Sequence, residues 1–396
     1  MKQGWEIKKL GEVCEINPSK KEAIKKLELN DKVSFLPMED LGINAYYITP
    51  SQERLLSEVL SSYTYFADGD VLLAKVSPCF ENGKIGIANN LTNGVGFGSS
   101  EYLTFRLGKD VIKEFLYFYL QNKTFVKEAT KNLTGTSGLR RVPKSFVESC
   151  IISVPPISEQ ERIVEELNCL SGVIEKKREQ LRELDALAES IFYTMFGDPI
   201  TNEKGWEVDR LGNLCEISSS KRIYAHEYCD NGIPFYRGKE ISEKSKGNDI
   251  SVELYISEER YNELKNKFGV PQIGDILLTA VGTIGNIWVV DSCTPFYFKD
   301  GNVLWLQAKE NINPIYFKTL LYNLIDKYKE SMANGCAYSA LTIVNLKEMK
   351  TNKVPYTLQQ EFADKIALIE KQKQLIKESI AQTEELFNSR MAYYFN

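Results

Sequence analysis

The apolar positions between residues 158 and 196 recur every three or four residues, which is typical of one long helix. They are Ile163, Leu167, Leu170, Ile174, Leu181, Leu184, Ala188, Ile191 and Met195, interrupted at Lys177. This spacing gives a narrow seam that a helix buries against a partner helix. Ser158 and Glu161 have the spacing of a capping box, and Pro155-Pro156 lies just ahead. We therefore predict a spacer helix over 158–196.

A second segment, residues 358–396, has the same rhythm, interrupted at Lys373 and Arg390. Its apolar series includes Thr383 and Tyr394, and neither helix can bury its stripe alone. We predict that the two helices pair through Ile163, Leu167, Leu170, Ile174, Leu181, Leu184, Ile191, Phe362, Ile366, Ile369, Ile376, Ile380 and Phe387. The alternative is that each helix packs on its neighbouring globular domain.

The whole sequence is an internal repeat at a shift of about 200 residues. Gly-Trp-x-x-x-x-Leu-Gly stands at 4–11 and 205–212, and Gly-Asp-x-Leu-Leu at 69–73 and 274–278. Near the helices, Gln160-Glu161 is matched to Gln360-Glu361, whereas residues 17–65 and 218–270 have diverged. We therefore predict four parts: globular domain 1–157, spacer helix 158–196, globular domain 197–357 and spacer helix 358–396.

Each globular domain reads as a mixture of short strands and helices. Strands are predicted within 70–76, 83–88 and 102–107, and again within 275–280, 284–290 and 302–307, where short apolar runs are bounded by glycine. Segments 115–122 and 315–323 look helical. The repeated Trp5/Trp206 and Cys14/Cys215 are most simply core positions. The fold class is α+β (mixed).

The order domain, helix, domain, helix constrains how the helices pair. At about 1.5 Å per residue the first seam is roughly 50 Å long. The short link between Pro355 and Gln359 leaves no room for a return connection. We therefore expect an antiparallel coiled coil with the two domains related by a pseudo-two-fold axis.

The composition of the chain argues against several classes of function. The chain has 396 residues with one histidine, His226, and eight cysteines without a Cys-x-x-Cys pair. A zinc site and histidine-based catalysis are therefore disfavoured, and we expect reduced, buried thiols in a cytoplasmic protein. No apolar run is long enough to span a membrane, and the segment beginning at Met1 lacks the pattern of a signal peptide. No phosphate-binding loop or adenine-methyltransferase tetrad is present.

The net charge of −5 lies entirely in the predicted helices, −4 in 159–196 and −1 in 359–395, so the domains are neutral overall. Local basic faces on the domains are compatible with DNA, which offers two separated sites along one ligand. Basic and aromatic residues expected in loops are the candidate DNA contacts. They are Lys20, Lys21, Tyr46, Tyr47, Lys75, Lys84, Arg140, Arg141 and Lys144 in the first domain, and Lys221, Arg222, Tyr236, Arg237, Lys239 and Lys299 in the second.

These landmarks resemble the DNA specificity subunit of type I restriction-modification systems across the whole chain. The most specific is Val-Pro-Pro-Ile-Ser-Glu-Gln-Glu-Arg-Ile at 154–163, leading into the long helix that ends Met195-Phe196-Gly197-Asp198-Pro199. The second copy departs from it at 355–362, Pro-Tyr-Thr-Leu-Gln-Gln-Glu-Phe. The resemblance implies two target-recognition domains, each reading one half of a split DNA sequence, with the paired helices setting the gap.

The resemblance also implies partners and cofactors. The helices would dock two methyltransferase (modification) subunits, and restriction subunits would join that core. S-adenosylmethionine, ATP and magnesium would belong to those partners, so this chain would be a non-catalytic recognition subunit. The two half-sites should differ, because Arg140-Arg141 is matched to Ala340-Leu341. The alternative is a coiled-coil scaffold whose end domains bind proteins.

Overall fold

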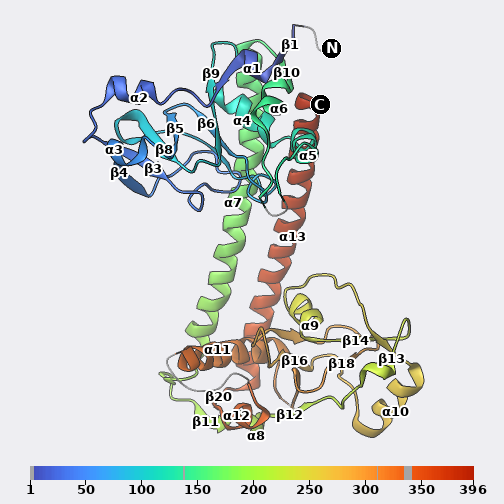
Figure 1. Ribbon diagram of the computed structural model, residues 1–396. Helices are drawn as coiled ribbons and strands as arrows, with labels where there is room; N and C mark the ends of the chain where they lie inside the picture. The colour runs from blue at the N-terminus through green and yellow to red at the C-terminus, as the bar shows by residue number, and fades with distance from the viewer. Residues whose placement is uncertain (1–3, 137–138, 310, 334–340) are drawn as a thin grey trace. The chain divides into compact units, whose positions relative to one another are not determined.

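The computed structural model describes the chain except for residues 1–3, 137–138, 310 and 334–340 (Figure 1). The chain divides into two compact units. The first is Met1–Arg178 with Lys377–Asn396, and the second is Glu179–Ile376. Two 40-residue helices, α7 (Ile157–Phe196) and α13 (Tyr356–Phe395), each contribute one half to either unit.

The described part of the first unit has three sheets. β1 (Glu6–Lys9) pairs antiparallel with β10 (Ile151–Val154). A second, antiparallel sheet has the order β2 (Cys14–Ile16), β9 (Tyr102–Leu107), β6 (Val71–Ala74) and β7 (Ile85–Ile87). A third has the order β4 (Gln52–Leu55), β3 (Lys32–Leu36), β8 (Val95–Gly98) and β5 (Thr64–Ala67), with β3 and β8 parallel. The shorter helices are α1 (Leu10–Val13), α2 (Lys21–Lys26), α3 (Leu56–Val59), η1 (Thr92–Gly94), α4 (Lys113–Gln121), α5 (Lys123–Lys131) and α6 (Lys144–Ser149).

In its described residues the second unit repeats the first two sheets, whereas its third sheet keeps the parallel pair but differs in its edge strands. β11 (Glu207–Arg210) pairs with β20 (Lys350–Lys353). The two larger sheets have the orders β12 (Cys215–Ser219), β19 (Val303–Ala308), β16 (Ile276–Thr279), β17 (Ile287–Val289), and β13 (Tyr228–Cys229), β15 (Tyr255–Ile256), β14 (Ile233–Tyr236), β18 (Tyr297–Phe298). The shorter helices are α8 (Leu211–Leu214), η2 (Ala225–Glu227), α9 (Gly238–Ser245), α10 (Glu258–Phe268), α11 (Pro314–Ala333) and α12 (Ile343–Glu348).

The repeat extends into the segments whose sequences have diverged. In the first unit Phe35 of β3 pairs in parallel with Phe97 of β8. In the second, Phe235 of β14 pairs in parallel with Tyr297 of β18. All four aromatic side chains are buried. Both domains therefore contain a parallel pair of strands with buried aromatic side chains, although the surrounding sequences differ.

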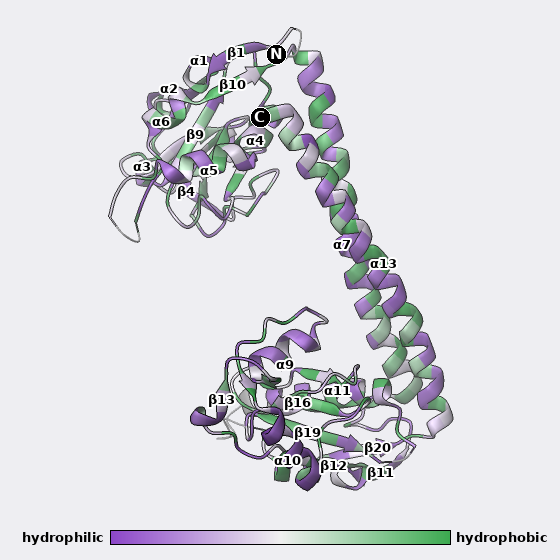
Figure 2. Ribbon diagram, turned by 90° about the vertical axis from the view of Figure 1, so that its right-hand side faces the viewer, coloured by the Kyte–Doolittle hydropathy of each residue, from purple (hydrophilic) through white to green (hydrophobic). Residues whose placement is uncertain are grey.

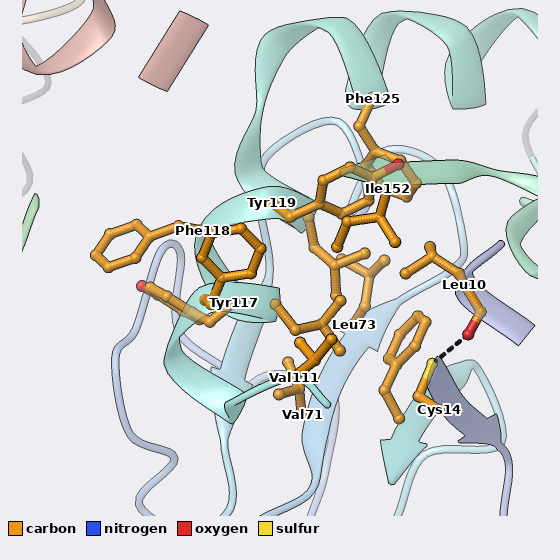
Figure 3. Packing of buried hydrophobic residues seen from close by; sticks show 14 of the residues in the cluster. Leu10, Cys14, Val71, Leu73, Val111, Tyr117, Phe118, Tyr119, Phe125 and Ile152 are labelled. Atoms are coloured by element: carbon orange, nitrogen blue, oxygen red, sulfur yellow. Dashed lines mark hydrogen bonds between the residues drawn. The ribbon is translucent and has the colours of Figure 1, made fainter. Parts of the chain in front are cut away.

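Each domain core forms between its antiparallel sheet and the helices that follow it. In the first domain, Leu10, Val71, Leu73 and Ile152 pack with the aromatic residues of α4 (Figure 3). Cys14 lies among them, and its Sγ donates to the carbonyl of Leu10, as Figure 3 shows. Cys215 makes the same bond to Leu211 in the second domain. Burial raises the pKa of both thiols to about 12, so they remain protonated.

The core prediction for these two cysteines is confirmed, and Trp5 and Trp206 pack half-buried against the same cores. The expectation of buried thiols throughout is wrong for Cys169 and Cys293, which are exposed. Seven cysteines among the described residues are free, and Cys336 lies outside them.

The helices pair antiparallel within each unit, as predicted. In the first unit the opening turns of α7 pack with the closing turns of α13, where Ile163, Leu167, Met391 and Tyr394 share one cluster. In the second, the end of α7 and the start of α13 meet at Phe192 and Phe362. Every predicted seam residue is buried or half-buried, and Figure 2 shows apolar and polar residues alternating around both helices.

The residues that interrupt the seam, Lys177, Lys373 and Arg390, make polar contacts between the two helices. Lys177 donates to the Ser379 hydroxyl. In the second unit, the Lys373 ammonium lies 2.7 Å from Asp185 and 2.8 Å from Glu370. Burial alone would lower the pKa of Lys373, but these two carboxylates raise it. Arg390 Nε lies 2.8 Å from Glu166. Because a buried ammonium without a partner is costly, the Lys373 contacts favour the one alignment of the helices in which Asp185 lies opposite.

A buried glutamine attaches the start of each helix to its domain. Gln160 Oε1 accepts from the Ile112 backbone at 3.0 Å, and its Nε2 donates to the carbonyls of Asp110 and Pro155. Gln359 accepts from Asn313 N at 2.9 Å and donates to the Val354 carbonyl. Gln160 therefore corresponds to Gln359. The match to Gln360, which is exposed, is wrong, because the second copy is one residue shorter before its helix.

The two neighbouring glutamines allow a direct test. Gln359→Ala leaves two buried backbone groups unpaired and should lower the free energy of unfolding by about 2–3 kcal/mol. Gln360→Ala, on the exposed face, should cost less than about 1 kcal/mol. Urea unfolding followed by circular dichroism measures both, and equal losses would contradict the assignment of Gln359 as the anchor.

Candidate nucleic-acid interface

Most of the predicted DNA-contacting residues are already held by contacts within the protein. Three of them, Lys21, Lys144 and Lys239, lie in the first turns of α2, α6 and α9 rather than in loops. Lys20 and Lys84 donate to backbone carbonyls, at 3.0 Å to Leu60 and 2.6 Å to Met38. These contacts hold the ammonium groups against the surface, although each side chain keeps unused donors.

One basic group in the first domain lies where β6 ends and β9 begins. Lys75 Nζ donates to the Ser100 carbonyl at 2.8 Å. Arg141 forms a two-pronged ion pair with Glu101, with distances of 2.8 and 2.7 Å. Hydrogen bonds from Arg141 hold the pKa of Glu101 below its ordinary value. Arg140 is exposed, and its guanidinium makes no hydrogen bond or ion pair with the described residues.

Lys144 is held elsewhere in this domain, where its Nζ donates to the Ile16 carbonyl at 2.7 Å. It also lies 3.5 Å from Glu148. The side chain of Lys21 is exposed in α2, near the diverged part of the domain. The structure therefore brings together Lys75, Arg140 and Arg141. The ammonium of Lys144 is held at Ile16 instead, and Lys20 and Lys21 lie at the start of α2.

The second domain gathers its basic residues around acidic ones. Arg237 Nη2 and Lys239 Nζ each lie 2.8 Å from a carboxylate oxygen of Glu253. Arg237 also binds Glu240, which is 2% exposed. Burial works to raise the pKa of Glu240, but the hydrogen bonds from Arg237 outweigh it and lower the pKa. Glu240 therefore stays charged and holds the guanidinium of Arg237 in place.

A second basic group in this domain surrounds Asp300. Arg222 Nε lies 2.9 Å and Lys299 Nζ 3.5 Å from its carboxylate. Lys221 is exposed, with its ammonium 4.8 Å from the centre of the Phe268 ring. The backbone of Lys299 donates to the Tyr236 carbonyl, so β14 and β18 join the two basic groups. Tyr236 lies in β14, Arg237 directly follows it and Lys299 directly follows β18, so this pair of strands positions three of the predicted residues of the second domain.

The predicted aromatic contacts fare differently. Tyr236 is only 7% exposed and stacks on Phe296, with ring centres 4.8 Å apart. The prediction that it contacts bases is wrong, because both the sheet and the Phe296 ring cover it. Tyr46 is half-buried and its hydroxyl accepts from Asn168 of α7 at 2.9 Å. Tyr47 is 45% exposed and is the one predicted aromatic residue available to a ligand.

Sequence reasoning missed the acidic residues that organise these groups. Glu101, Glu240, Glu253 and Asp300 each hold at least one predicted basic residue. A basic residue two or three positions from an acidic one, as in Arg237-Gly-Lys-Glu240, signals such pairing in the sequence. Pairs distant in sequence, such as Arg141 with Glu101, give no such signal.

Comparison with known proteins gives the family of this chain. Residues 2–185 and 203–385 match the family described as type I restriction modification DNA specificity domain. The two matches cover most of the chain, so the chain belongs to this family and contains its domain twice.

Individual relatives agree with this assignment. The specificity subunit of the type I restriction enzyme EcoAI from Escherichia coli is 34% identical over 200 residues, 48% of this chain. This chain spans only 33% of that relative's length. The specificity subunit of the type I restriction enzyme MjaIX from Methanocaldococcus jannaschii is 29% identical over 289 residues, covering 66% of this chain and 63% of the relative.

A solved structure shows the same fold. A chain from a structure on complex assembly and conformational transition of a type I R-M system aligns over 100% of this chain and 98% of its own length. The TM-score is 0.65 at 18% sequence identity. Two further observations concern the described residues of this chain. They contain no helix able to cross a membrane, and no cluster of three or more His, Cys, Asp or Glu side chains suited to a metal.

The different surroundings of the two tyrosines give a stability test. Tyr236→Ala removes a buried ring and should lower the free energy of unfolding by about 3–4 kcal/mol. Tyr47→Ala, at an exposed position, should cost less than about 1 kcal/mol. Urea unfolding measures both, and a neutral Tyr236→Ala variant would contradict the buried placement.

The ion pairs of Glu253 give a titration test. Hydrogen bonds from Lys239, and then from Arg237, lower the pKa of Glu253 to about 2. A lowered pKa means that these contacts stabilise the fold above the ordinary pKa of a glutamate and are lost as the pH falls toward 2. Lys239→Met should raise the Glu253 pKa toward its ordinary value, as seen by carboxyl NMR, while Lys244→Met on the same helix should leave it unchanged. An unshifted Glu253 in both variants would exclude the Lys239 contact.

Proposed function

We propose that this chain is the DNA-reading subunit of a type I restriction-modification complex. Each globular domain reads one half of a split target, and the paired helices set the number of unspecified base pairs between the halves. The observation that supports this most is the duplication: the family's DNA specificity domain occurs twice, and each copy is built on two antiparallel helix segments. A duplicated reading domain suits a ligand with two separated sites.

The two copies carry different basic groups, which supports different half-sites. The first domain places Lys75 and Glu101 beside its arginines. At the same strand positions the second domain has Ala280 and Asn302, because Ala280 N bonds to Asn302 O as Lys75 N bonds to Glu101 O. The second domain instead concentrates charge at Arg237 and Lys239. Specific contacts depend on side chains at fixed positions, so domains that differ in this way read different bases.

The outer side of α13 supports a role in docking partners. Leu368, Leu375, Leu386 and Tyr393 are 70%, 59%, 47% and 58% exposed. Leu368 and Leu375 lie in the second unit, and Leu386 and Tyr393 lie in the first. The spacing of seven residues within each pair places its two members on one side of the helix. Apolar side chains exposed in a row are typical of a protein interface. We assign this side to two methyltransferase (modification) subunits in the cytoplasm.

The remaining subunits complete the proposal. Restriction subunits join the methyltransferase core, and S-adenosylmethionine, ATP and magnesium are bound by these partners. The present chain contributes recognition and positioning, with the catalytic groups on the partner subunits. The basic side chains described above supply the contacts to phosphate and base edges.

The deciding experiment is methylome sequencing of a host before and after deletion of the gene. We expect complete loss of adenine methylation at one bipartite motif, two short specified halves around a fixed gap, and recovery when the gene is restored. As a control, a chain lacking residues 377–396 should fail to restore it, because the first unit loses Met391 and Tyr394 from its core.

An unchanged methylome, in a host that expresses the chain with an active methyltransferase, would overturn this function. The scaffold alternative would then gain support if the purified chain bound proteins without salt-dependent affinity for DNA. Loss of methylation at a continuous motif would retain DNA reading and exclude the two-half arrangement.

A further inference from the structure

The loop between Thr134 and Val142 of the first domain is closed by hydrogen bonds between its two ends, and its second end is also bonded to the segment that follows β6. Thr134 and Arg141 exchange backbone hydrogen bonds of 2.9 and 2.8 Å. Val142 N donates to the Lys75 carbonyl, and Ser77 N to the Arg140 carbonyl, both at 2.9 Å. These four bonds fix the backbone of residues 140–142 relative to the end of β6.

Gly135 shows how closely the two sides of this loop approach. Its φ is +119°, and a Cβ there would lie 2.9 Å from the Leu139 carbonyl oxygen. Any other residue would be strained at this φ and would push the two sides apart. The conformation that presents residues 139 and 140 therefore depends on a glycine at 135.

The two adjacent arginines of the loop have different surroundings. The guanidinium of Arg141 donates twice to Glu101 and once, at 3.0 Å, to the Leu139 carbonyl. Its charge is therefore balanced by Glu101 and its donors are mostly used. The guanidinium of Arg140 has no such partner among the described residues, and its neighbour Leu139 is 56% exposed.

We propose that Arg140 reads a guanine in the half-site of the first domain, and that Arg141 with Glu101 is the pair that positions it. An arginine fork donates to O6 and N7 of guanine in the major groove, the base contact that best matches its geometry. A fixed backbone lowers the entropy lost when the side chain binds. This inference rests on the proposed function, and it names one residue and one base within it.

The second domain lacks the corresponding group. Leu341 N donates to the Ala280 carbonyl, as Val142 N does to Lys75. Arg141 therefore corresponds to Ala340 and Arg140 to Ser339, both outside the described residues, and the earlier match of Arg140-Arg141 to Ala340-Leu341 is off by one position. With Asn302 in place of Glu101, neither the reading arginine nor its positioning pair is present. The proposal therefore applies to one half-site only.

The test compares methylomes of a host that expresses the full chain, or a variant, with its methyltransferase partner. With Arg140→Gln, one guanine position in one half-site should become degenerate, with discrimination at that position falling by roughly 10- to 100-fold. The other half-site and the gap should stay unchanged. Arg140→Lys should keep part of the preference, because an ammonium donates to guanine without the fork.

The positioning pair is tested separately. Glu101→Gln should weaken discrimination at the same guanine and at no other position. A merely structural pair would instead lower methylation evenly over the whole motif. Arg210→Gln, which removes an exposed arginine from β11 in the second domain, is the charge-matched control for Arg140→Gln and should leave the motif as it was.

Three outcomes would overturn the proposal. They are an unchanged motif with Arg140→Gln, an even loss of methylation with that variant, which indicates a phosphate contact, and a native motif with no guanine in either half. The absence of any bipartite motif with the unaltered chain is a different result, because it would overturn the proposed function and this inference with it.

Discussion

The structure depends on two long helices that cannot bury their apolar seams alone. A seam of leucine, isoleucine and phenylalanine forces them together, and the four-three spacing keeps it facing the partner over the whole length. Lysine and arginine stand at the breaks in the seam and bind Ser379, Asp185 and Glu166 across it. Apolar burial supplies the attraction, and the polar contacts exclude pairings shifted by a turn, in which a charged side chain would lose its partner.

The two domains share an internal frame but carry different surfaces. The same strand order in the antiparallel sheet, the same cysteine bond to the carbonyl four residues earlier, and the same glutamine anchor recur in both copies. The side chains that face solvent near the strand ends do not recur. This division is physically reasonable, because the frame needs buried partners in fixed places, whereas an exposed arginine or lysine needs only a stable backbone beneath it.

Much of the fold could be predicted from the sequence, because the seam and the short apolar runs are periodic. The helix pairing and the strands around Val71 and Ile276 followed from spacing alone. The aromatic sheets that take strands from 17–65 and 218–270 could not be predicted, because a parallel pair such as Phe35 with Phe97 joins distant segments. Tyr236 was misjudged for a similar reason, since the Phe296 ring that covers it is far away in sequence. Glu101, the acidic partner of Arg141, is equally distant in sequence. The positive charge of Arg141 could therefore be predicted, but its ion pair could not.

The division of the chain into units has a consequence for evolution. The second unit is one uninterrupted stretch, Glu179–Ile376, inserted between the two parts of the first. A genetic exchange with crossovers inside the two helix-coding regions would therefore replace a whole unit together with its core partners. Crossovers at the ends of the globular domains would instead place a new domain on the original helices. Its core would then have to pack against helix residues selected for another domain, such as Phe192 and Phe362. Recombination within the helix-coding regions would thus exchange a complete unit, change one specificity and keep the packing of each core.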